Sequence, residues 1–428
     1  MNCRKLDIVK FLTVPEFLYI FFVFFSLVRY VSRVQTCEKI YVIVDFTATR
    51  KYFHQYPLIT KISRFLLDNG FKPHILLPVT AERKDIELTH ATVDFILDSG
   101  YSSRNYKIVR HSIHKLLTVL ENQNVFIKYL KKILIKRYIR SALCFFQKLD
   151  ESKNKNIVFP TLDPLSLQLA KQVSEFSNMK NFFFYFRVIG SESRGPLSSN
   201  LELQTLRKLA SDFPSKIKIG VETNGYRTYL ENLGFDSDMI FWSPWPSCID
   251  FENPRVSNRR FTIGFLGCAK QRKGFDLIPT ILNQLKGESL NFQVLIQEAN
   301  FPWANYPNTK ESIELIMGEK VTFLSGDLNI SELQNYISHC NLMILPYDAG
   351  SYSINASGVL YHASDLNVPV LTAKGVGFES EIIDFSLGGV YDKLDKIPAL
   401  LQKLQTMEFG FAKYNSQRNL ATHQFFLD

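Results

Sequence analysis

Short apolar runs of the kind that form buried strands recur through the chain, and segments with a helical pattern lie between them. The run at 39–46 (KIYVIVDF) is rich in β-branched residues, a helix is expected at 57–69 before Gly70, and a second run follows at 72–78. Runs that are continuously apolar are typical of parallel strands that helices cover on both faces. The sequence therefore predicts an α/β protein.

The same pattern begins again after a polar stretch at 250–260, where we expect a domain boundary. A chain of 428 residues is too long for one ordinary core and suits two α/β domains of roughly 150 to 200 residues each. Further strands are expected in the first half at 156–162, 181–188 and 216–222, and in the second half at 261–267, 292–297, 341–347 and 368–373. We expect two Rossmann-like, doubly wound domains that face a cleft.

These patterns divide the chain into four parts. The expected parts are an N-terminal hydrophobic segment at 1–38, a first Rossmann-like domain at 39–245, a second Rossmann-like domain at 246–412, and a helix at 413–428. In parallel α/β domains the binding residues follow the carboxyl ends of the strands. Candidate site residues are therefore expected in the loops that follow those strands.

Cysteine and histidine spacing gives no sign of a metal site. The six cysteines lie far apart without a C-x-x-C pair, so neither a zinc site nor a disulfide framework is indicated, and a reducing compartment fits best. The histidines have no metal-ligand spacing, and the D-x-D run at 236–238 lies in a loop far from the turns described below. We expect neither a metal nor a cofactor.

The formal charge of +9 indicates an anionic partner. Lysines and arginines alternate with apolar residues at 126–140, which reads as a basic amphipathic helix; it could lie on a membrane surface, cover the core with a solvated outer face, or bind nucleic acid. The apolar run at 17–28 is too short to span a bilayer by itself and reads as an interfacial or shallow anchor, or as a buried helix. We expect a cytoplasmic protein in peripheral contact with the inner face of the membrane, and no nucleic acid partner.

The sharpest chemical signal is the run at 264–274 (GFLGCAKQRKG), where a strand leads into a glycine-containing turn with three cations and a helix follows. Backbone N–H groups and side-chain cations can converge there on a diphosphate. Cations can also stabilise a leaving diphosphate without a metal. The alternative is an exposed basic turn.

A second turn of the same kind follows the strand at 341–347, and it ends where Ser357 and Gly358 open a new helix. A hydroxyl N-cap and the free N–H groups at a helix start make an anion site. Two such sites in one domain favour a nucleotide diphosphate.

The runs FLG..K..KGF at 265–275, LPY at 345–347 and SGVL......N.PVL at 357–371 resemble those of the retaining GT-B glycosyltransferases of the glycogen-synthase-like class, in particular bacterial enzymes of surface-polysaccharide synthesis. The resemblance covers the C-terminal domain, about 170 residues, and implies the GT-B fold and transfer of a hexose from a nucleotide-sugar donor to a lipid-linked saccharide or other saccharide acceptor. It also implies that the domain at 246–412 binds the nucleotide sugar, that the domain at 39–245 binds the acceptor, and that the helix at 413–428 crosses back to pack on the first domain. Metal independence and retention of configuration are likewise implied by the resemblance.

The resemblance also implies roles for residues of the two turns. Its donor diphosphate site consists of Gly267, Lys270, Lys273, Gly274, Ser357 and Gly358, and its donor sugar or nucleotide contacts are Tyr347, Tyr352 and His362. Lys270 stands where one branch of the family has arginine. Two glutamates separated by seven residues in the family correspond here to Ile354 and His362, neither of which is a carboxylate.

Four residues of the N-terminal half are expected on the acceptor side. Asp163 and His54 are the catalytic candidates, to orient the acceptor hydroxyl, and Arg50 and Arg187 are the acceptor-binding candidates. Asp163 could instead be a helix N-cap, and His54 an ordinary surface histidine. The alternatives to a glycosyltransferase are a catalytically impaired GT-B-like partner subunit, a sugar-nucleotide epimerase on the same fold, and a basic nucleic-acid-binding protein.

Overall fold

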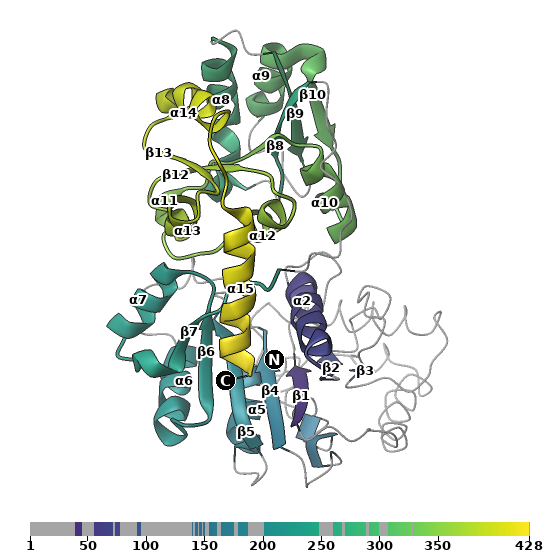
Figure 1. Ribbon diagram of the computed structural model, residues 1–428, viewed down its shortest axis with the longest axis vertical. Helices are drawn as coiled ribbons and strands as arrows, with labels where there is room; N and C mark the ends of the chain where they lie inside the picture. The colour runs from purple at the N-terminus through teal and green to yellow at the C-terminus, as the bar shows by residue number, and fades with distance from the viewer. Residues whose placement is uncertain are drawn as a thin grey trace, which may run out of the picture.

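The computed structural model (Figure 1) contains two parallel sheets with flanking helices. It describes residues 39–44, 55–71, 73–77, 92–95, 139, 142–143, 145–147, 149, 154–160, 164–174, 179–186, 201–247, 260–267, 270–287, 291–298, 307–326 and 328–427. The apolar run at 17–28 and nearly all of the basic segment at 126–140 lie outside these residues, so their expected roles stay predictions. None of the helices that the structure describes has both the length and the hydropathy to cross a bilayer.

The N-terminal sheet has the strand order β3-β2-β1-β4-β5-β6-β7, and neighbouring strands are parallel. Its strands are β1 (Lys39–Val44), β2 (His74–Leu77), β3 (Thr92–Phe95), β4 (Asn154–Phe159), β5 (Met179–Phe186), β6 (Ile217–Val221) and β7 (Ile240–Trp242). The helices described with it are α2 (Gln55–Asp68), α5 (Pro164–Val173), α6 (Leu201–Asp212) and α7 (Asn224–Asn232). The strand order reverses between β1 and β4, which is the place where open α/β sheets bind ligands.

The C-terminal sheet has the strand order β10-β9-β8-β11-β12-β13, again parallel. Its strands are β8 (Phe261–Phe265), β9 (Phe292–Gln297), β10 (Val321–Leu324), β11 (Leu342–Leu345), β12 (Val370–Ala373) and β13 (Gly388–Tyr391). Its helices are α8 (Ile278–Lys286), α9 (Pro307–Met317), α10 (Ile330–Ser338), α11 (Ala349–Tyr352), α12 (Gly358–Asp365), α13 (Glu379–Asp384) and α14 (Ile397–Leu404). The expected α/β fold with two doubly wound sheets is confirmed.

Helix α15 (Phe411–Phe426) crosses from the C-terminal sheet to the N-terminal sheet (Figure 1). At its start, Phe411 and Tyr414 pack into a core cluster of the C-terminal domain. At its end, Phe425 and Phe426 pack among buried residues of the N-terminal sheet, and the Tyr41 hydroxyl donates a hydrogen bond to the Phe426 carbonyl oxygen (2.8 Å). One helix therefore belongs to the cores of both domains.

The same core cluster of the N-terminal domain takes in a residue from α12. Tyr361 is 2% exposed, contacts Trp245 at 5.4 Å between ring centres, and donates a hydrogen bond to the Glu222 carbonyl oxygen (3.2 Å). Trp245, which is fully buried, lies in the connection between the two sheets. Apolar packing around α12, α15 and the connection therefore forms one part of the interface between the domains.

Candidate functional site

The turn after β8 depends on two glycines. Gly267 has φ +111 and donates its backbone N–H to the Gln297 side-chain oxygen (2.7 Å). Gly274 has φ +67, and a Cβ there would stand 1.7 Å from the Pro346 carbonyl oxygen. L-residues rarely adopt these backbone angles, so both glycines are required by geometry.

The turn after β8 packs directly on the turn after β11. The Asp348 N–H donates to the Arg272 carbonyl oxygen (2.9 Å), and Gly274 lies against Pro346. Since β8 and β11 are neighbours in the sheet, their carboxyl ends bring together two turns that lie about 75 residues apart in the sequence. The structure therefore places side by side the two turns that the sequence singled out.

Two cations of the first turn lie over two tyrosines of the second. The Lys273 ammonium is 5.4 Å from the centre of the Tyr347 ring, and the Arg272 guanidinium is 5.6 Å from that of Tyr352. The two rings are themselves 4.5 Å apart. Aromatic faces attract cations at such distances, so the two tyrosine rings stabilise the positions of Lys273 and Arg272. Lys270 is exposed and precedes the 3₁₀ turn Gln271–Lys273.

The start of α12 lies next to the same cations. The Ser357 hydroxyl is the N-cap of α12, accepts the Leu360 N–H (3.4 Å), and is 3.2 Å from the Tyr347 hydroxyl. A Cβ built on Gly267 would be 3.3 Å from the Lys273 ammonium nitrogen and 3.2 Å from a methyl carbon of Val359. The first turn of α12, the Lys273 ammonium and Gly267 therefore converge on one place, and Gly358 is the first residue of that helix.

Such a convergence can bind an anion. The first N–H groups of a helix carry partial positive charge, and an ammonium beside them adds a full charge. The carboxylate of Asp348 accepts the Ser351 N–H and hydroxyl (2.8 and 2.7 Å), and these hydrogen bonds lower its pKa. That carboxylate thus caps α11. Among the described residues, no group of three or more His, Cys, Asp or Glu side chains is arranged to hold a metal ion.

His362 and Ile354 each contact another part of the structure. His362 is 3% exposed, with its Nδ1 atom 3.3 Å from the Gln334 amide nitrogen, and burial lowers its pKa to about 3. It is a neutral interior residue of α12 that faces Gln334 of α10, and its expected contact with the donor stays a prediction. Ile354 packs against the core of the N-terminal domain. Neither residue could be placed from the sequence, because His362 contacts Gln334 on another helix and Ile354 packs against the other domain.

The acceptor-side candidates lie outside the described residues. Arg50 and His54 follow β1, Asp163 follows β4, and Arg187 follows β5. These three strands are neighbours in the order β1-β4-β5, so their carboxyl ends lie at one edge of the sheet. The roles of these four residues stay predictions.

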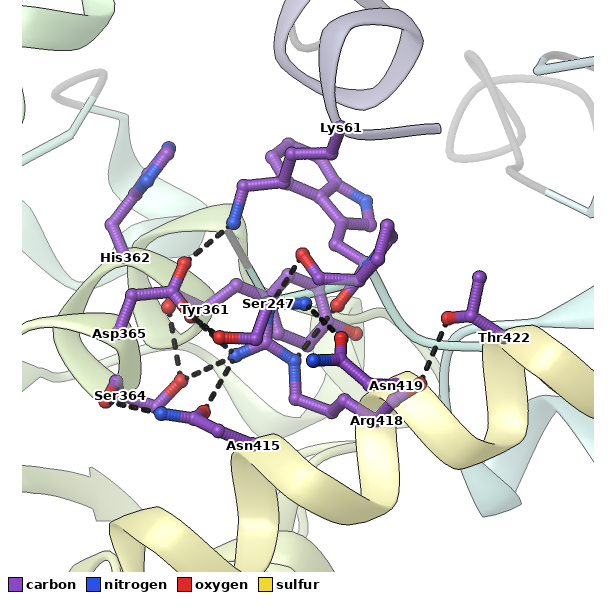
Figure 2. A network of polar contacts seen from close by, with 12 residues as sticks. Lys61, Ser247, Tyr361, His362, Ser364, Asp365, Asn415, Arg418, Asn419 and Thr422 are labelled. Atoms are coloured by element: carbon purple, nitrogen blue, oxygen red, sulfur yellow. Dashed lines mark hydrogen bonds and ion pairs between the residues drawn. The ribbon is translucent and has the colours of Figure 1, made fainter. Parts of the chain in front are cut away.

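The far end of α12 is held by a buried network that the sequence analysis missed (Figure 2). The Asp365 carboxylate lies between the Lys61 ammonium of α2 (2.6 Å) and the Arg418 guanidinium of α15 (2.9 Å), and it accepts the Ser247 hydroxyl (2.8 Å). The side chains of Lys61, Asp365 and Arg418 are 7%, 3% and 0% exposed. One signal was present: Lys61 shares a helical face with apolar residues of α2, and a cation on such a face needs a buried partner.

Arg418 also joins the two connections between the domains. Its guanidinium donates to the carbonyl oxygens of Trp245 (2.8 Å) and Pro246 (3.3 Å) in the connecting segment, and to the Ser364 hydroxyl (2.8 Å) on α12. Asn419, on the next position of α15, accepts the Ser247 N–H (2.8 Å). The connecting segment, α12 and α15 therefore meet at one polar centre (Figure 2).

Comparisons with known proteins identify the fold. The sequence matches no protein-family model and no curated protein. Sucrose-phosphate synthase from Thermosynechococcus elongatus is similar in structure, with a TM-score of 0.59 at 13% identity over 91% of this chain and 95% of that one. Anabaena HepE in complex with UDP and glucose has a TM-score of 0.57 at 13% identity, covering 90% of this chain and 95% of that chain.

A third solved structure is a variant of S. aureus TarM in complex with fondaparinux, alpha-GlcNAc-glycerol and UDP, with a TM-score of 0.56 at 10% identity over 91% of this chain and 97% of that one. At this level of identity the similarity speaks for the fold. With two parallel sheets joined by α15, the chain has the two-domain GT-B fold that these proteins share.

Proposed function

We propose that the chain is a glycosyltransferase that takes its sugar from a nucleotide-diphosphate sugar. The observation that carries this proposal is the convergence of the Lys273 ammonium, Gly267 and the capped start of α12 at the carboxyl ends of β8 and β11. A helix start beside a cation is suited to a diphosphate. The GT-B fold and the UDP in the HepE and TarM complexes support the same reading.

In the proposed reaction, the bond between the anomeric carbon and the diphosphate oxygen breaks as the acceptor hydroxyl oxygen attacks that carbon. Charge then develops on the diphosphate, and Lys273 and Lys270, with Arg272 beside them, would stabilise it without a metal. The leaving phosphate would take the proton of the acceptor hydroxyl on the same face of the sugar, which gives retention of configuration. His54 and Asp163 would orient that hydroxyl.

The proposed acceptor is a lipid-linked saccharide used for surface polysaccharide, reached at the inner face of the cell membrane. The formal charge of +9, the basic segment at 126–140 and the apolar run at 17–28 support this part of the proposal. Anionic lipid head groups attract such basic amphipathic segments. We expect the protein to bind anionic liposomes, salt to reverse that binding, and DNA not to retain the protein.

Calorimetric titration of the full chain with UDP, GDP and their common sugar conjugates tests the donor site. We expect one nucleotide diphosphate to bind, and the Lys270→Ala/Lys273→Ala double variant to lose that binding. The matched control is Lys393→Ala/Lys396→Ala, which removes the same charge from exposed positions of the same domain. Equal affinity of the folded double variant and the unchanged chain would remove these lysines from the site.

A second candidate is a catalytically impaired GT-B-like subunit that binds a sugar nucleotide and assists a partner. The placement of Ile354 in the domain interface and of His362 in the interior favours it, since no carboxylate stands at either position. Nucleotide binding without any turnover of the donor, in the presence of lipid-linked saccharide acceptors, would select this candidate.

A further inference from the structure

The loop at 353–357 joins two parts of the proposed donor site. It runs from Tyr352, whose ring lies under the Arg272 guanidinium, to Ser357, the N-cap of α12. Its conformation therefore sets both the position of the tyrosine and the start of the helix. We call it the donor loop.

The donor loop is held from the N-terminal domain by the start of α7. The Thr223 hydroxyl donates to the Ile354 carbonyl oxygen (2.7 Å), and the Tyr226 hydroxyl donates to the Asn355 side-chain oxygen (2.6 Å). Thr223 and Tyr226 are 0% and 2% exposed. Figure 1 shows α7 of the N-terminal sheet facing α11 and α13 of the other domain.

Both contacts have a fixed direction. The Thr223 hydroxyl oxygen already accepts the Tyr226 N–H as the N-cap of α7 (3.2 Å), so its one proton is left for the donor loop. The Asn355 amide nitrogen donates to the Ser351 carbonyl oxygen (2.8 Å), so both ends of that amide are used. The side chain therefore cannot rotate without breaking a bond at each end.

Space on either side of the donor loop is restricted as well. A Cβ on Gly225 would be 3.2 Å from the Ser353 carbonyl oxygen, and one on Gly377 would be 2.5 Å from the Ile354 carbonyl carbon. The Gly377 N–H also donates to the Tyr352 carbonyl oxygen (2.6 Å). The donor loop is thus enclosed between α7 and the turn after β12.

A continuous set of hydrogen bonds leads from α7 to the cationic turn. Tyr226 bonds to Asn355, Asn355 to the Ser351 backbone, Ser351 to the Asp348 carboxylate, and the Asp348 N–H to the Arg272 carbonyl oxygen. Each link joins groups that the other links fix in place. This set of bonds therefore connects α7 of the N-terminal domain to the turn that carries Arg272, at the proposed diphosphate site.

We propose that Tyr226 and Thr223 are positioning residues of the donor site, supplied by the opposite domain, which hold the donor loop ready for the nucleotide diphosphate. This inference rests on the proposed function. A loop that is already ordered loses less conformational entropy when the ligand binds, which strengthens binding without a direct contact. Ile354, at one of the two positions where the family that the sequence resembles has a glutamate, serves here as part of the contact between the domains.

The test uses Tyr226→Phe in the full chain. The matched control is Tyr229→Phe, because Tyr229 lies one turn further along α7 and is half-buried against the core of the N-terminal domain. Titration with UDP and with GDP should give about three- to tenfold weaker binding of whichever binds the unchanged chain, as expected for one lost buried hydrogen bond. Hydrogen exchange of amides at 350–357 without nucleotide should become faster. Tyr229→Phe should change neither.

A double-mutant cycle separates positioning from general destabilisation. Because Tyr226→Phe and Asn355→Ala remove the same hydrogen bond, the double variant should lose no more UDP or GDP affinity than Asn355→Ala alone. Additive losses, or a folded Tyr226→Phe variant with unchanged affinity and exchange, would overturn this inference alone. Failure of the unchanged chain to bind either nucleotide would overturn the proposed function, and this inference with it.

Discussion

Replacing Asp365 with asparagine is expected to destabilise the protein strongly while keeping the side-chain shape. The Asp365 carboxylate is 3% exposed and is 2.6 Å from the Lys61 ammonium and 2.9 Å from the Arg418 guanidinium. Asparagine would leave these two buried cations facing each other without their shared counter-charge. Removal of one partner from a buried ion pair costs about 3–5 kcal/mol.

The size of the thermal shift follows from the length of the chain. An entropy of unfolding of about 2.1 cal/mol/K per residue gives roughly 0.9 kcal/mol/K for 428 residues. A loss of about 4 kcal/mol therefore lowers Tm by about 4–5 °C, which differential scanning calorimetry at pH 7 measures directly. The matched control is Asp68→Asn, because Asp68 pairs with Arg64 on the same helix in solvent (3.0 Å, side chains 59% and 44% exposed) and such a pair contributes about 0–1 kcal/mol.

Two further results are expected if the missing charge of Asp365 causes the loss of stability. Adding Lys61→Met to Asp365→Asn should recover part of the lost stability, since one uncompensated buried cation is removed. Burial by itself raises the pKa of Asp365, but the charges of Arg418 and Lys61 outweigh it and hold the pKa below the ordinary 3.8. The contribution of the Asp365 ion pairs to the free energy of unfolding is therefore complete above about pH 4, and it is lost as the pH falls through the lowered pKa. A Tm within 1 °C of the unchanged protein, or no recovery with Lys61→Met, would refute the reasoning.

Three shorter predictions concern other sites. Gly274→Ala should lower both Tm and the affinity for UDP or GDP, because the added Cβ would collide with the Pro346 carbonyl oxygen at φ +67. The control Gly318→Ala, at φ +54 with open space around it, should show only the smaller cost of backbone strain. Burial raises the pKa of Glu381 to about 7, so the free energy of unfolding should fall by up to about 3 kcal/mol as the pH rises from 4.5 to 7. Urea unfolding of Glu381→Gln should lack this fall with pH, and an identical fall in the variant would count against the prediction. His362→Gln should leave the pH dependence of nucleotide binding unchanged between pH 5 and 8, since burial lowers the pKa of His362 to about 3 and the ring stays neutral; a lost titration step would contradict this.

The strands in the middle of each sheet were predictable because they are buried on both faces. The run at 292–297 is continuously apolar but for its glutamines and coincides with β9 from end to end. The strands that were missed are β3, β7, β10 and β13, which lie at or near the sheet edges. β13 begins with two glycines, and β10 (VTFL) has only four residues with a threonine among them, so neither gives a strong apolar signal.

The donor side of the site was predictable to the extent that it is local. Gly267 and Gly274 can be read as glycines of a turn from their positive φ angles, and Ser357 as a helix cap, because backbone angles and caps are local features. The close approach of Gly274 to Pro346 is not local and could not be read in this way. The contact of the Lys273 ammonium with the Tyr347 ring depends instead on the neighbouring positions of β8 and β11. That neighbourhood follows from the doubly wound topology, which the sequence also predicted.

What the sequence could not predict is that α12 has different neighbours at its two ends. Ser357 at its start lies beside the proposed diphosphate site, and Asp365 at its end lies between cations of α2 and α15. The two cations lie 304 and 53 residues from Asp365 along the chain, so no local pattern pairs them with it. Since α12 has only eight residues, a rotation of one domain against the other that separates Lys61 from Arg418 must either break the ion pairs of Asp365 or move the start of α12 as well. The ion pairs between the domains and the proposed diphosphate site are therefore joined by one short helix, and Ile354 in the loop before that helix packs against the core of the other domain.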